Sequence, residues 1–218
     1  MAKRGNISMS VIRRLPRYYR YLTELMQSNI TRISSKELSM KMGLTASQIR
    51  QDLNCFGGFG QQGYGYIVDQ LRDEIAQILG LDNVKKAIVL GAGNLGQAVA
   101  NYLEFETRGF QLVGIFDNNP NIIGTTIFHD TKVLDVANLM EFCQREQPEM
   151  AVMCTPKEAS EPLVEQLYAS NIRFFWNFSH FNISRKYPDD VTVEAVHLND
   201  SLMTLSYMMD NQEDSSES

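Results

Sequence analysis

Hydrophobic residues recur with two different spacings along the 218-residue chain. Up to about residue 80, apolar positions lie three and four residues apart, which is the spacing of amphipathic helices. From residue 85, short unbroken apolar runs typical of buried strands alternate with helical patterns. Strands and helices that alternate in this way imply a parallel sheet with right-handed crossovers. We therefore expect an α/β protein with a helical N-terminal domain, residues 1–80, and a parallel-sheet domain, residues 85–196.

The N-terminal domain contains start and stop signals for several short helices. An apolar stripe runs from residue 11 to 26, and Pro16 within it means that the helix either begins near this proline or is kinked there. Residues 34–37 and 45–48 each match the S/T-x-x-E/Q capping box that opens a helix, and Gly43 between them can end the first of these two helices. Two short helices joined by a tight turn form a helix-turn-helix.

The second helix of this pair has a polar face suited to DNA. Ile49, Leu53 and Phe56 fall on one side and should pack inward. The opposite side carries side chains that can hydrogen-bond to base edges in a major groove, namely Ser47, Gln48, Arg50, Gln51 and Asn54. An ordinary polar surface is the alternative, and the neighbouring segments favour DNA.

Glycines alternate with aromatic residues over residues 56–66. This spacing favours a β-hairpin over a low-complexity linker. After a helix-turn-helix, such a hairpin is the wing of a winged helix, and Gln61 and Gln62 would contact the sugar-phosphate backbone. An amphipathic helix over residues 68–79, closed by Gly80, ends the domain.

Charge is distributed unevenly between the two parts of the chain. Residues 1–70 contain ten Lys and Arg against four Asp and Glu, whereas residues 71–218 contain ten against 22. A basic module is the electrostatic footprint of phosphate binding, and the acidic remainder would be repelled by a duplex. We expect Arg13, Arg14 and Arg17 to contact DNA phosphates.

The second domain opens with the arrangement of a dinucleotide-binding unit. A short apolar strand, residues 87–90, leads into Gly91-Ala92-Gly93-Asn94-Leu95-Gly96, and a helical pattern follows over residues 97–106. The first glycine allows the tight turn, the second lets the backbone approach a diphosphate, and the third lets helix and strand pack closely. The diphosphate would lie on unpaired N–H groups at the start of the helix.

A second strand, residues 112–116, ends in Asp117, 21 residues beyond Gly96. A carboxylate at this position can accept hydrogen bonds from both ribose hydroxyls and would repel a 2′-phosphate. The next three residues are Asn, Asn and Pro, so NAD(H) is favoured over NADP(H). That Asp117 merely caps a loop is the weaker alternative. Thr155 and Pro156 end a later strand at the same edge and are further candidates for contact with the dinucleotide.

The remaining elements are predicted from shorter patterns. After Asp117 we expect an irregular stretch around Ile127 and Val133, and then, in order, a helix at 136–145, a strand at 150–154, a helix at 159–169 and a strand at 172–176. A final apolar stripe runs over residues 197–209 and is formed by Leu198, Leu202, Leu205 and Met209. It is either covered by its own domain or, as we expect, forms a dimerisation helix. The acidic residues 210–218 are expected to be disordered.

Several classes of protein are excluded or disfavoured. Cys55, Cys143 and Cys154 are odd in number and far apart, which argues against a disulfide framework and against a zinc site, and no other metal site is expected. A redox role for Cys55 remains an alternative to that of a small apolar residue. No apolar run approaches the ~20 residues of a membrane span, and the first residues lack a secretion signal, so a cytoplasmic protein is expected.

A dehydrogenase would need a substrate domain and an acid/base group beside the nicotinamide. The second domain has barely enough residues for the nucleotide fold, and His129, His180 and His197 form no catalytic pattern. A CoA-binding or structural module is the third possibility, and Asp117 argues against CoA. The combination of a winged helix and a dinucleotide fold suggests a ligand-controlled DNA-binding protein that is not an enzyme.

The chain as a whole resembles the Rex family of redox-sensing transcriptional repressors over about residues 8 to 209. The segments that carry the resemblance are SSKELSMKMGLTASQIRQDLNCFGGFGQQGYGY, GAGNLGQAVANY, GIFDNNP, CTPKEA, WNFSHF and VHLNDSLMTLSY. The resemblance implies a winged helix, a Rossmann domain and a domain-swapped C-terminal helix. It also implies a homodimer that binds palindromic operator DNA when NAD⁺ is plentiful and leaves it when NADH binds.

The same resemblance implies roles for individual residues. It places Arg50 and Gln51 at the DNA, although some members have Lys at the second position. It places Tyr102 near the nicotinamide and Arg20 at the hinge between the domains. His197 falls where some relatives carry an aspartate that pairs with the hinge arginine, so this switch contact must differ here, and Asp200 is the candidate substitute.

Overall fold

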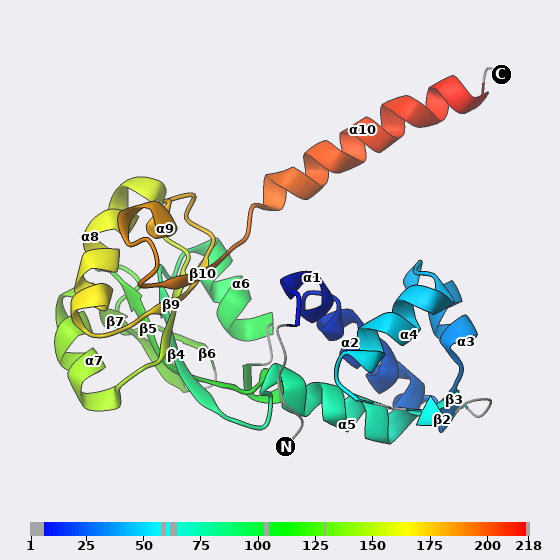
Figure 1. Ribbon diagram of the computed structural model, residues 1–218. Helices are drawn as coiled ribbons and strands as arrows, with labels where there is room; N and C mark the ends of the chain where they lie inside the picture. The colour runs from blue at the N-terminus through cyan, green and yellow to red at the C-terminus, as the bar shows by residue number, and fades with distance from the viewer. Residues whose placement is uncertain (1–6, 58–59, 62–64, 103–104, 129, 217–218) are drawn as a thin grey trace. The chain divides into compact units, whose positions relative to one another are not determined.

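The computed structural model describes residues 7–57, 60–61, 65–102, 105–128 and 130–216. Contacts between residues divide the chain into two units, Met1–Asn83 and Val84–Ser218. Figure 1 shows helices and a small sheet in the first unit, and a large sheet flanked by helices in the second. Each unit is described in turn.

Unit 1 is a bundle of helices with a three-stranded antiparallel sheet of order β1-β3-β2. Its elements are α1 (Met9–Ile12), α2 (Leu15–Gln27), β1 (Arg32–Ile33), α3 (Ser35–Met42), α4 (Ala46–Asn54), β2 (Gly60–Gln61), β3 (Gly65–Ile67) and α5 (Val68–Leu79). Pro16 lies in the first turn of α2, where its missing N–H costs nothing. Of the two alternatives for this proline, the helix start is confirmed.

The capping signals of the helix-turn-helix are confirmed at α3 and half confirmed at α4. Ser34 Oγ accepts the Glu37 N–H at 3.2 Å, and the Glu37 carboxylate accepts the Ser34 N–H at 2.8 Å. Thr45 Oγ1 accepts the Gln48 N–H at 3.1 Å, but the Gln48 side chain donates to Asp52 at 2.8 Å. Gly43 ends α3 with φ +62°, a left-handed conformation that glycine adopts without strain.

The predicted hairpin is confirmed as β2 and β3, which pair antiparallel. Residues 58, 59 and 62–64 of the glycine-aromatic segment, including Gln62, lie outside the described residues. Tyr66 of β3 is buried in the core of the unit, beside α2, α4 and α5 residues such as Leu22, Ile49 and Leu71. Gly80 ends α5 with φ +70°, as its sequence position predicted.

Unit 2 is built on a seven-stranded sheet of order β10-β9-β8-β4-β5-β7-β6. The strands are β4 (Lys85–Leu90), β5 (Phe110–Asp117), β6 (Thr126–Phe128), β7 (Thr131–Asp135), β8 (Met150–Met153), β9 (Phe174–Asn177) and β10 (Thr192–Ala195). All neighbours are parallel except β6 and β7. From β7 to β10 this is the doubly wound order of dinucleotide-binding sheets, and the order reverses between β4 and β8.

Helices cover the two faces of this sheet, with α7 and α8 on one face and α6 on the other (Figure 1). The helical segments are α6 (Asn94–Tyr102), η1 (Phe105–Arg108), η2 (Val136–Asn138), α7 (Leu139–Glu146), α8 (Lys157–Ala169), α9 (Ile183–Lys186) and α10 (Leu198–Ser216). Side chains of β4 alternate between the faces, so Ile88 and Leu90 belong to the cluster with α7 and α8, whereas Val89 belongs to the cluster with α6.

Two predictions for unit 2 were wrong, and one strand was not predicted. The stretch around Ile127 and Val133 is not irregular but forms the hairpin of β6 and β7. The helix predicted over residues 97–106 begins earlier, at Asn94, and residues 105 and 106 belong to the separate segment η1, Phe105–Arg108. The edge strand β10 was missed because its sequence, TVEA, is mostly exposed and shows little apolar patterning.

The C-terminal helix also differs from its prediction. The predicted stripe covers residues 197–209, whereas α10 runs from Leu198 to Ser216. Residues 210–216 contain neither Gly nor Pro, and their acidic composition showed only that they cannot form a core of their own. Among the described residues, no helix is both long and apolar enough to cross a bilayer.

Candidate nucleotide cleft and nucleic-acid interface

The glycine turn joins β4 to α6 at the point where the strand order reverses. Gly91 has φ +93°, and a Cβ there would lie 2.8 Å from the Cys154 carbonyl oxygen. A Cβ at Gly96 would lie 1.8 Å from the Gly91 carbonyl oxygen. Gly93, in contrast, has nothing within 4 Å of its Cβ position. The first and third glycines are therefore required by the turn itself, because a side chain at either would clash with backbone. The second glycine leaves free space next to the backbone of the turn.

Asp117 ends β5 beside this turn. Its Oδ2 accepts the Ala92 N–H at 2.6 Å, and its Oδ1 accepts the Asn119 N–H at 2.8 Å. These bonds hold the carboxylate next to the glycines, and the bond from Asn119 also caps the loop after β5, while the ribose contact stays a prediction. Since each carboxylate oxygen has two acceptor sites, both oxygens retain the capacity to bind a hydroxyl.

A cavity of about 470 Å³ opens between the turn and the carboxyl ends of the strands. Its volume falls within the range of small-molecule sites. The lining includes predicted residues, namely Gly91, Gly93, Asn94, Leu95, Asp117, Thr155 and Pro156. Ala92 and Gly96 do not line the cavity but support the turn from behind. Tyr102 is the last residue of α6, and its side chain lies outside the described residues.

The wall opposite the turn was not predicted. It is formed by Val136 of η2 and by Ala159, Pro162, Leu163 and Gln166 of α8. Nothing in the local sequence separates these residues from ordinary helix residues, because only the crossover that carries α8 back over the sheet places them at the cavity. We refer to this cavity as the dinucleotide cleft.

Cys154 also borders the dinucleotide cleft, but its thiol is not activated. Burial raises the pKa of Cys154 to about 12 and that of Cys143 to about 11, so both thiols are protonated at neutral pH. Within the described ranges, no three His, Cys, Asp or Glu side chains gather where they could hold a metal ion.

The polar face predicted for α4 is exposed in unit 1. Ser47, Arg50, Gln51 and Asn54 are exposed and line a shallow hollow together with Cys55. Ile49 and Leu53 are buried on the opposite side, and Phe56 packs against the same core. Arg50 Nη1 donates to Ser35 Oγ at 3.0 Å, which joins this face to α3. Gln61 lies in β2, and its side chain is outside the described residues.

The arginines near the N-terminus differ in their exposure and in their partners. Arg13 is exposed. Arg14 pairs with buried Asp52, with its Nε and Nη2 each 2.7 Å from a carboxylate oxygen. Arg17 donates to the Met42 carbonyl oxygen at 2.7 Å, at the end of α3. Arg14 and Arg17 thus have partners inside unit 1, and the phosphate contacts expected for them stay a prediction.

Asp52 is fully buried on the inner side of α4. Besides Arg14, it accepts hydrogen bonds from Tyr18 Oη at 3.0 Å and from Gln48 Nε2 at 2.8 Å. Burial raises the pKa of Asp52, but the hydrogen bonds from its three partners outweigh burial and hold this pKa below its usual value. The signal for this cluster was present in the sequence, because an aspartate next to Leu53 on the apolar side of a helix requires a partner.

The proposed switch residues lie at the start of α10, apart from Arg20. His197 precedes α10, and its Nδ1 is 3.1 Å from Nδ1 of His180, whose ring stacks on it. Asp200 is exposed in the first turn of α10. Arg20 is exposed on α2 of unit 1, so its contact with either residue stays a prediction. No functional role had been predicted for His180.

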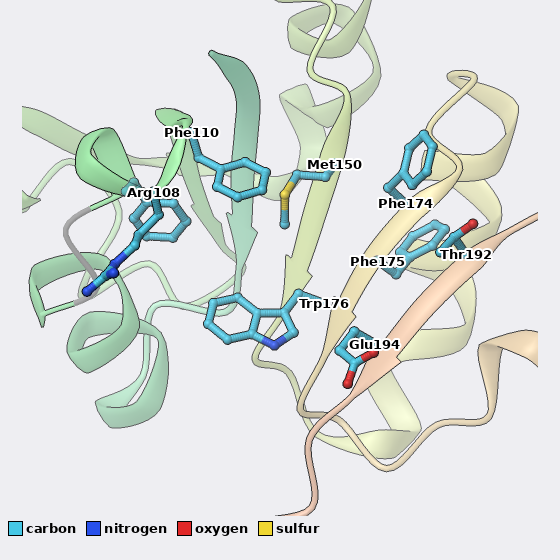
Figure 2. A pocket seen from close by; sticks show the side chains of 9 residues that line it. Arg108, Phe110, Met150, Phe174, Phe175, Trp176, Thr192 and Glu194 are labelled. Carbon is cyan, nitrogen blue, oxygen red and sulfur yellow. The ribbon is translucent and has the colours of Figure 1, made fainter. Parts of the chain in front are cut away.

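A second cavity, of about 460 Å³, lies at the opposite end of the sheet from the dinucleotide cleft. Met150, Phe174 and Thr192, the first residues of β8, β9 and β10, lie around it together with Phe110 of β5 (Figure 2). Figure 2 shows the Phe110 and Trp176 rings and the Met150 side chain directed toward a common space. This cavity is apolar, and no sequence motif indicated it.

Two family models match the chain. Residues 6–54 match a model described as the N-terminus of a putative DNA-binding protein, and residues 82–181 match one described as a CoA binding domain. The redox-sensing transcriptional repressor Rex of Thermoanaerobacter pseudethanolicus is 52% identical over 213 residues, which cover 98% of this chain and 94% of the relative. Rex of Clostridium acetobutylicum is 50% identical and covers 96% of each chain.

Solved structures agree with these matches. The crystal structure of RSP in complex with β-NAD⁺ and operator DNA has a TM-score of 0.86 at 51% identity and covers 98% of this chain and 97% of its own. RSP in complex with β-NADH has a TM-score of 0.87 at 48% identity and covers 98% and 99%. A further structure of RSP, described as a Rex-family repressor, has a TM-score of 0.85.

Proposed function

The chain belongs to the Rex family of redox-sensing transcriptional repressors, and we propose that it is itself an NADH-responsive repressor of transcription. In this proposal, a homodimer in the cytoplasm binds palindromic operator DNA when NAD⁺ is plentiful and leaves it when NADH binds. The protein carries out no reaction on the dinucleotide and acts only through binding.

One observation carries the proposal: a single chain holds both an exposed polar helix of a helix-turn-helix and a cleft with a glycine turn and Asp117. Related RSP has been crystallised with β-NAD⁺ and operator DNA and with β-NADH, which supports the same two ligands here.

The dinucleotide cleft has the groups that NAD(H) needs. Its diphosphate would lie over Gly93 at the start of α6, where first-turn N–H groups have no partner within the helix and the helix dipole favours negative charge. Asp117 would bind the adenosine ribose. These residues favour NAD(H) over CoA, despite the description of the matching family model, because the 3′-phosphate of CoA would face the carboxylate.

Unit 1 would bind DNA with α4 as the recognition helix. Base contacts would come from the exposed Ser47, Arg50, Gln51 and Asn54 and from the partly exposed Gln48. A two-fold symmetric dimer predicts half-sites about one or two helical turns apart, each ~10 bp. NADH and DNA must then weaken one another's binding by the same factor, because coupling between two sites is reciprocal.

The experiment that tests the proposal uses labelled DNA that the protein itself selects from a pool with a random segment of about 20 bp, or two helical turns. Fluorescence anisotropy at fixed salt follows release by NADH, NAD⁺, NADPH and CoA. Release by NADH at much lower concentration than by the other three is expected. DNA binding that is indifferent to all four, or release by CoA alone, would refute the proposal.

Asp117→Asn is expected to weaken NADH binding about tenfold and to remove most of the preference for NADH over NADPH. The variant keeps one oxygen that can accept the Ala92 N–H but loses the charge that repels a 2′-phosphate. Dinucleotide fluorescence titrations measure both affinities. Asp135→Asn is the matched control, because Asp135 also ends a strand and caps the next helical segment but does not line the cleft. Unchanged NADPH discrimination in Asp117→Asn would contradict the assigned role.

Leu202→Glu is expected to weaken the dimer by about 10- to 100-fold, the equivalent of one buried leucine. Leu198, Leu202, Leu205 and Met209 form a stripe on α10 and are 52% to 65% exposed in the single chain. Sedimentation velocity over a range of concentrations measures the change. Asn199→Glu adds the same charge beside the stripe, not within it, and should leave the dimer intact. Equal effects of the two variants would show that the stripe is not the contact.

A further inference from the structure

Asp52 binds two sets of partners with its two carboxylate oxygens. Oδ2 accepts from Arg14 Nε at 2.7 Å and from Tyr18 Oη at 3.0 Å, which fastens α4 to α2. Oδ1 accepts from Arg14 Nη2 at 2.7 Å and from Gln48 Nε2 at 2.8 Å. Since an ionised carboxylate has about four acceptor sites, these four bonds saturate it.

The bond to Gln48 shares the stabilisation of the buried charge with two other partners, and it also acts on Gln48. Arg14 supplies the opposite charge in a bidentate pair, and Tyr18 supplies a third donor. The fourth bond also fixes Gln48 itself. A glutamine amide can present its nitrogen or its oxygen in a given direction. With Nε2 held by Oδ1, the amide oxygen must point away from Asp52, because two acceptors repel each other.

Gln48 lies in the first turn of α4, three residues after the N-cap Thr45, and its side chain is partly exposed. In helix-turn-helix proteins, the N-terminal residues of the recognition helix contact the base edges. A free glutamine there reads adenine by donating to N7 and accepting from N6. A glutamine whose amide nitrogen is held by a buried carboxylate presents only one arrangement of its donor and acceptor to the DNA bases.

We propose that Asp52 is a positioning residue for base recognition, which fixes the side-chain amide of Gln48 and thereby sets the base preferred by the first turn of α4. This inference rests on the proposed function, in which α4 binds operator DNA. It gives a buried residue, which cannot touch DNA, an effect on sequence preference.

The test is selection of DNA from the same random pool by four proteins: wild type, Gln48→Ala, Asp52→Asn and the double variant. Gln48→Ala is expected to reduce discrimination about tenfold at one position of each half-site. Asp52→Asn should flatten the preference at that same position, because its amide cannot hold Gln48 and Arg14 as the carboxylate does. The double variant should match Gln48→Ala alone at that position.

Gly80→Ala is the control for loss of stability. It strains the left-handed residue that ends α5, away from α4, and should leave the selected sequence unchanged. If Asp52→Asn does not fold, the triple variant Arg14→Met, Tyr18→Phe, Asp52→Leu removes the charges and hydroxyl together while Gln48 still loses its acceptor. Replacement of a whole buried polar set is tolerated better than removal of one partner.

Several outcomes would overturn the inference. Asp52→Asn, or the triple variant in its place, would lower affinity for all sequences equally if Asp52 were only structural. Flattening at a different position, or no effect of Gln48→Ala on any position, would also exclude it. If the wild type selects no sequence at all, the proposed function fails, and the inference fails with it. Uniform weakening with normal wild-type selection refutes the inference alone.

Discussion

Gly96→Ala is expected to abolish dinucleotide binding, with affinity for NADH reduced more than 100-fold, and to destabilise unit 2 by about 3 kcal/mol or more. The added Cβ would lie 1.8 Å from the Gly91 carbonyl oxygen. That atom belongs to the backbone of the turn, so the clash cannot be relieved by rotating a side chain. Helix α6 must move from β4, and the cleft loses its shape.

Gly93→Ala is the matched comparison, because it adds the same methyl group to the same turn where nothing lies within 4 Å. We expect it to keep wild-type stability while binding NADH at least tenfold more weakly, since the methyl group would occupy the space next to the diphosphate. Thermal unfolding and NADH fluorescence titrations separate the two effects. A stable Gly96→Ala variant with normal NADH affinity would contradict the packing described for the turn.

Arg14→Met is expected to destabilise unit 1 by about 3 kcal/mol at neutral pH, because it leaves the Asp52 carboxylate buried without its counter-charge. Arg17→Met is the control. Arg17 is exposed and donates to a carbonyl oxygen, so its removal leaves no buried charge, and we expect a loss of about 1 kcal/mol. Denaturant unfolding of the full chain measures both.

The pH dependence of stability should change sign in Arg14→Met. In the wild type, the pKa of Asp52 is lower in the folded than in the unfolded protein, so its contribution is present above pH 3.8 and is lost as pH falls through the folded pKa. Without Arg14, burial should place the folded pKa above the unfolded one. Unfolding at several pH values from 3 to 7 then shows a variant that becomes less stable as pH rises. A parallel pH profile for both proteins would contradict this assignment.

The cleft was predicted well where the sequence carries backbone constraints. A glycine turn and a strand-ending acid have few other uses, so Gly91, Gly96 and Asp117 indicated their own geometry. The α8 wall was not predicted, because Ala159 and Leu163 acquire their role only when the crossover brings α8 to the cleft. Contacts that depend on how the chain crosses over the sheet leave no pattern in the local sequence.

The helix-turn-helix was predicted for a similar reason, since capping boxes and Gly43 are local signals. The contacts of its charged side chains were not predicted. Arg14 was predicted to contact phosphate because the surrounding residues are basic, and its pairing with Asp52, 38 positions away, was not predicted. A count of charged residues describes the charge of a surface only after the residues in buried ion pairs have been left out of the count. The edge strands β6 and β10 were missed because they bury too little to show alternation, and β7, which lies between β5 and β6, is short and fully buries only Val133.

The bond from the Ala92 N–H to Asp117 joins two protein groups across the glycine turn. Because this hydrogen bond already holds the turn in place, NADH does not have to order the turn when it binds. Binding of NADH should therefore be a single fast step. The lifetime of the bound dinucleotide, not the speed of its arrival, then governs how soon repression returns after NADH falls. A repressor with such a cleft would leave DNA promptly when the NADH concentration rises. It would return to DNA, after NADH falls, with a delay of about the residence time of bound NADH.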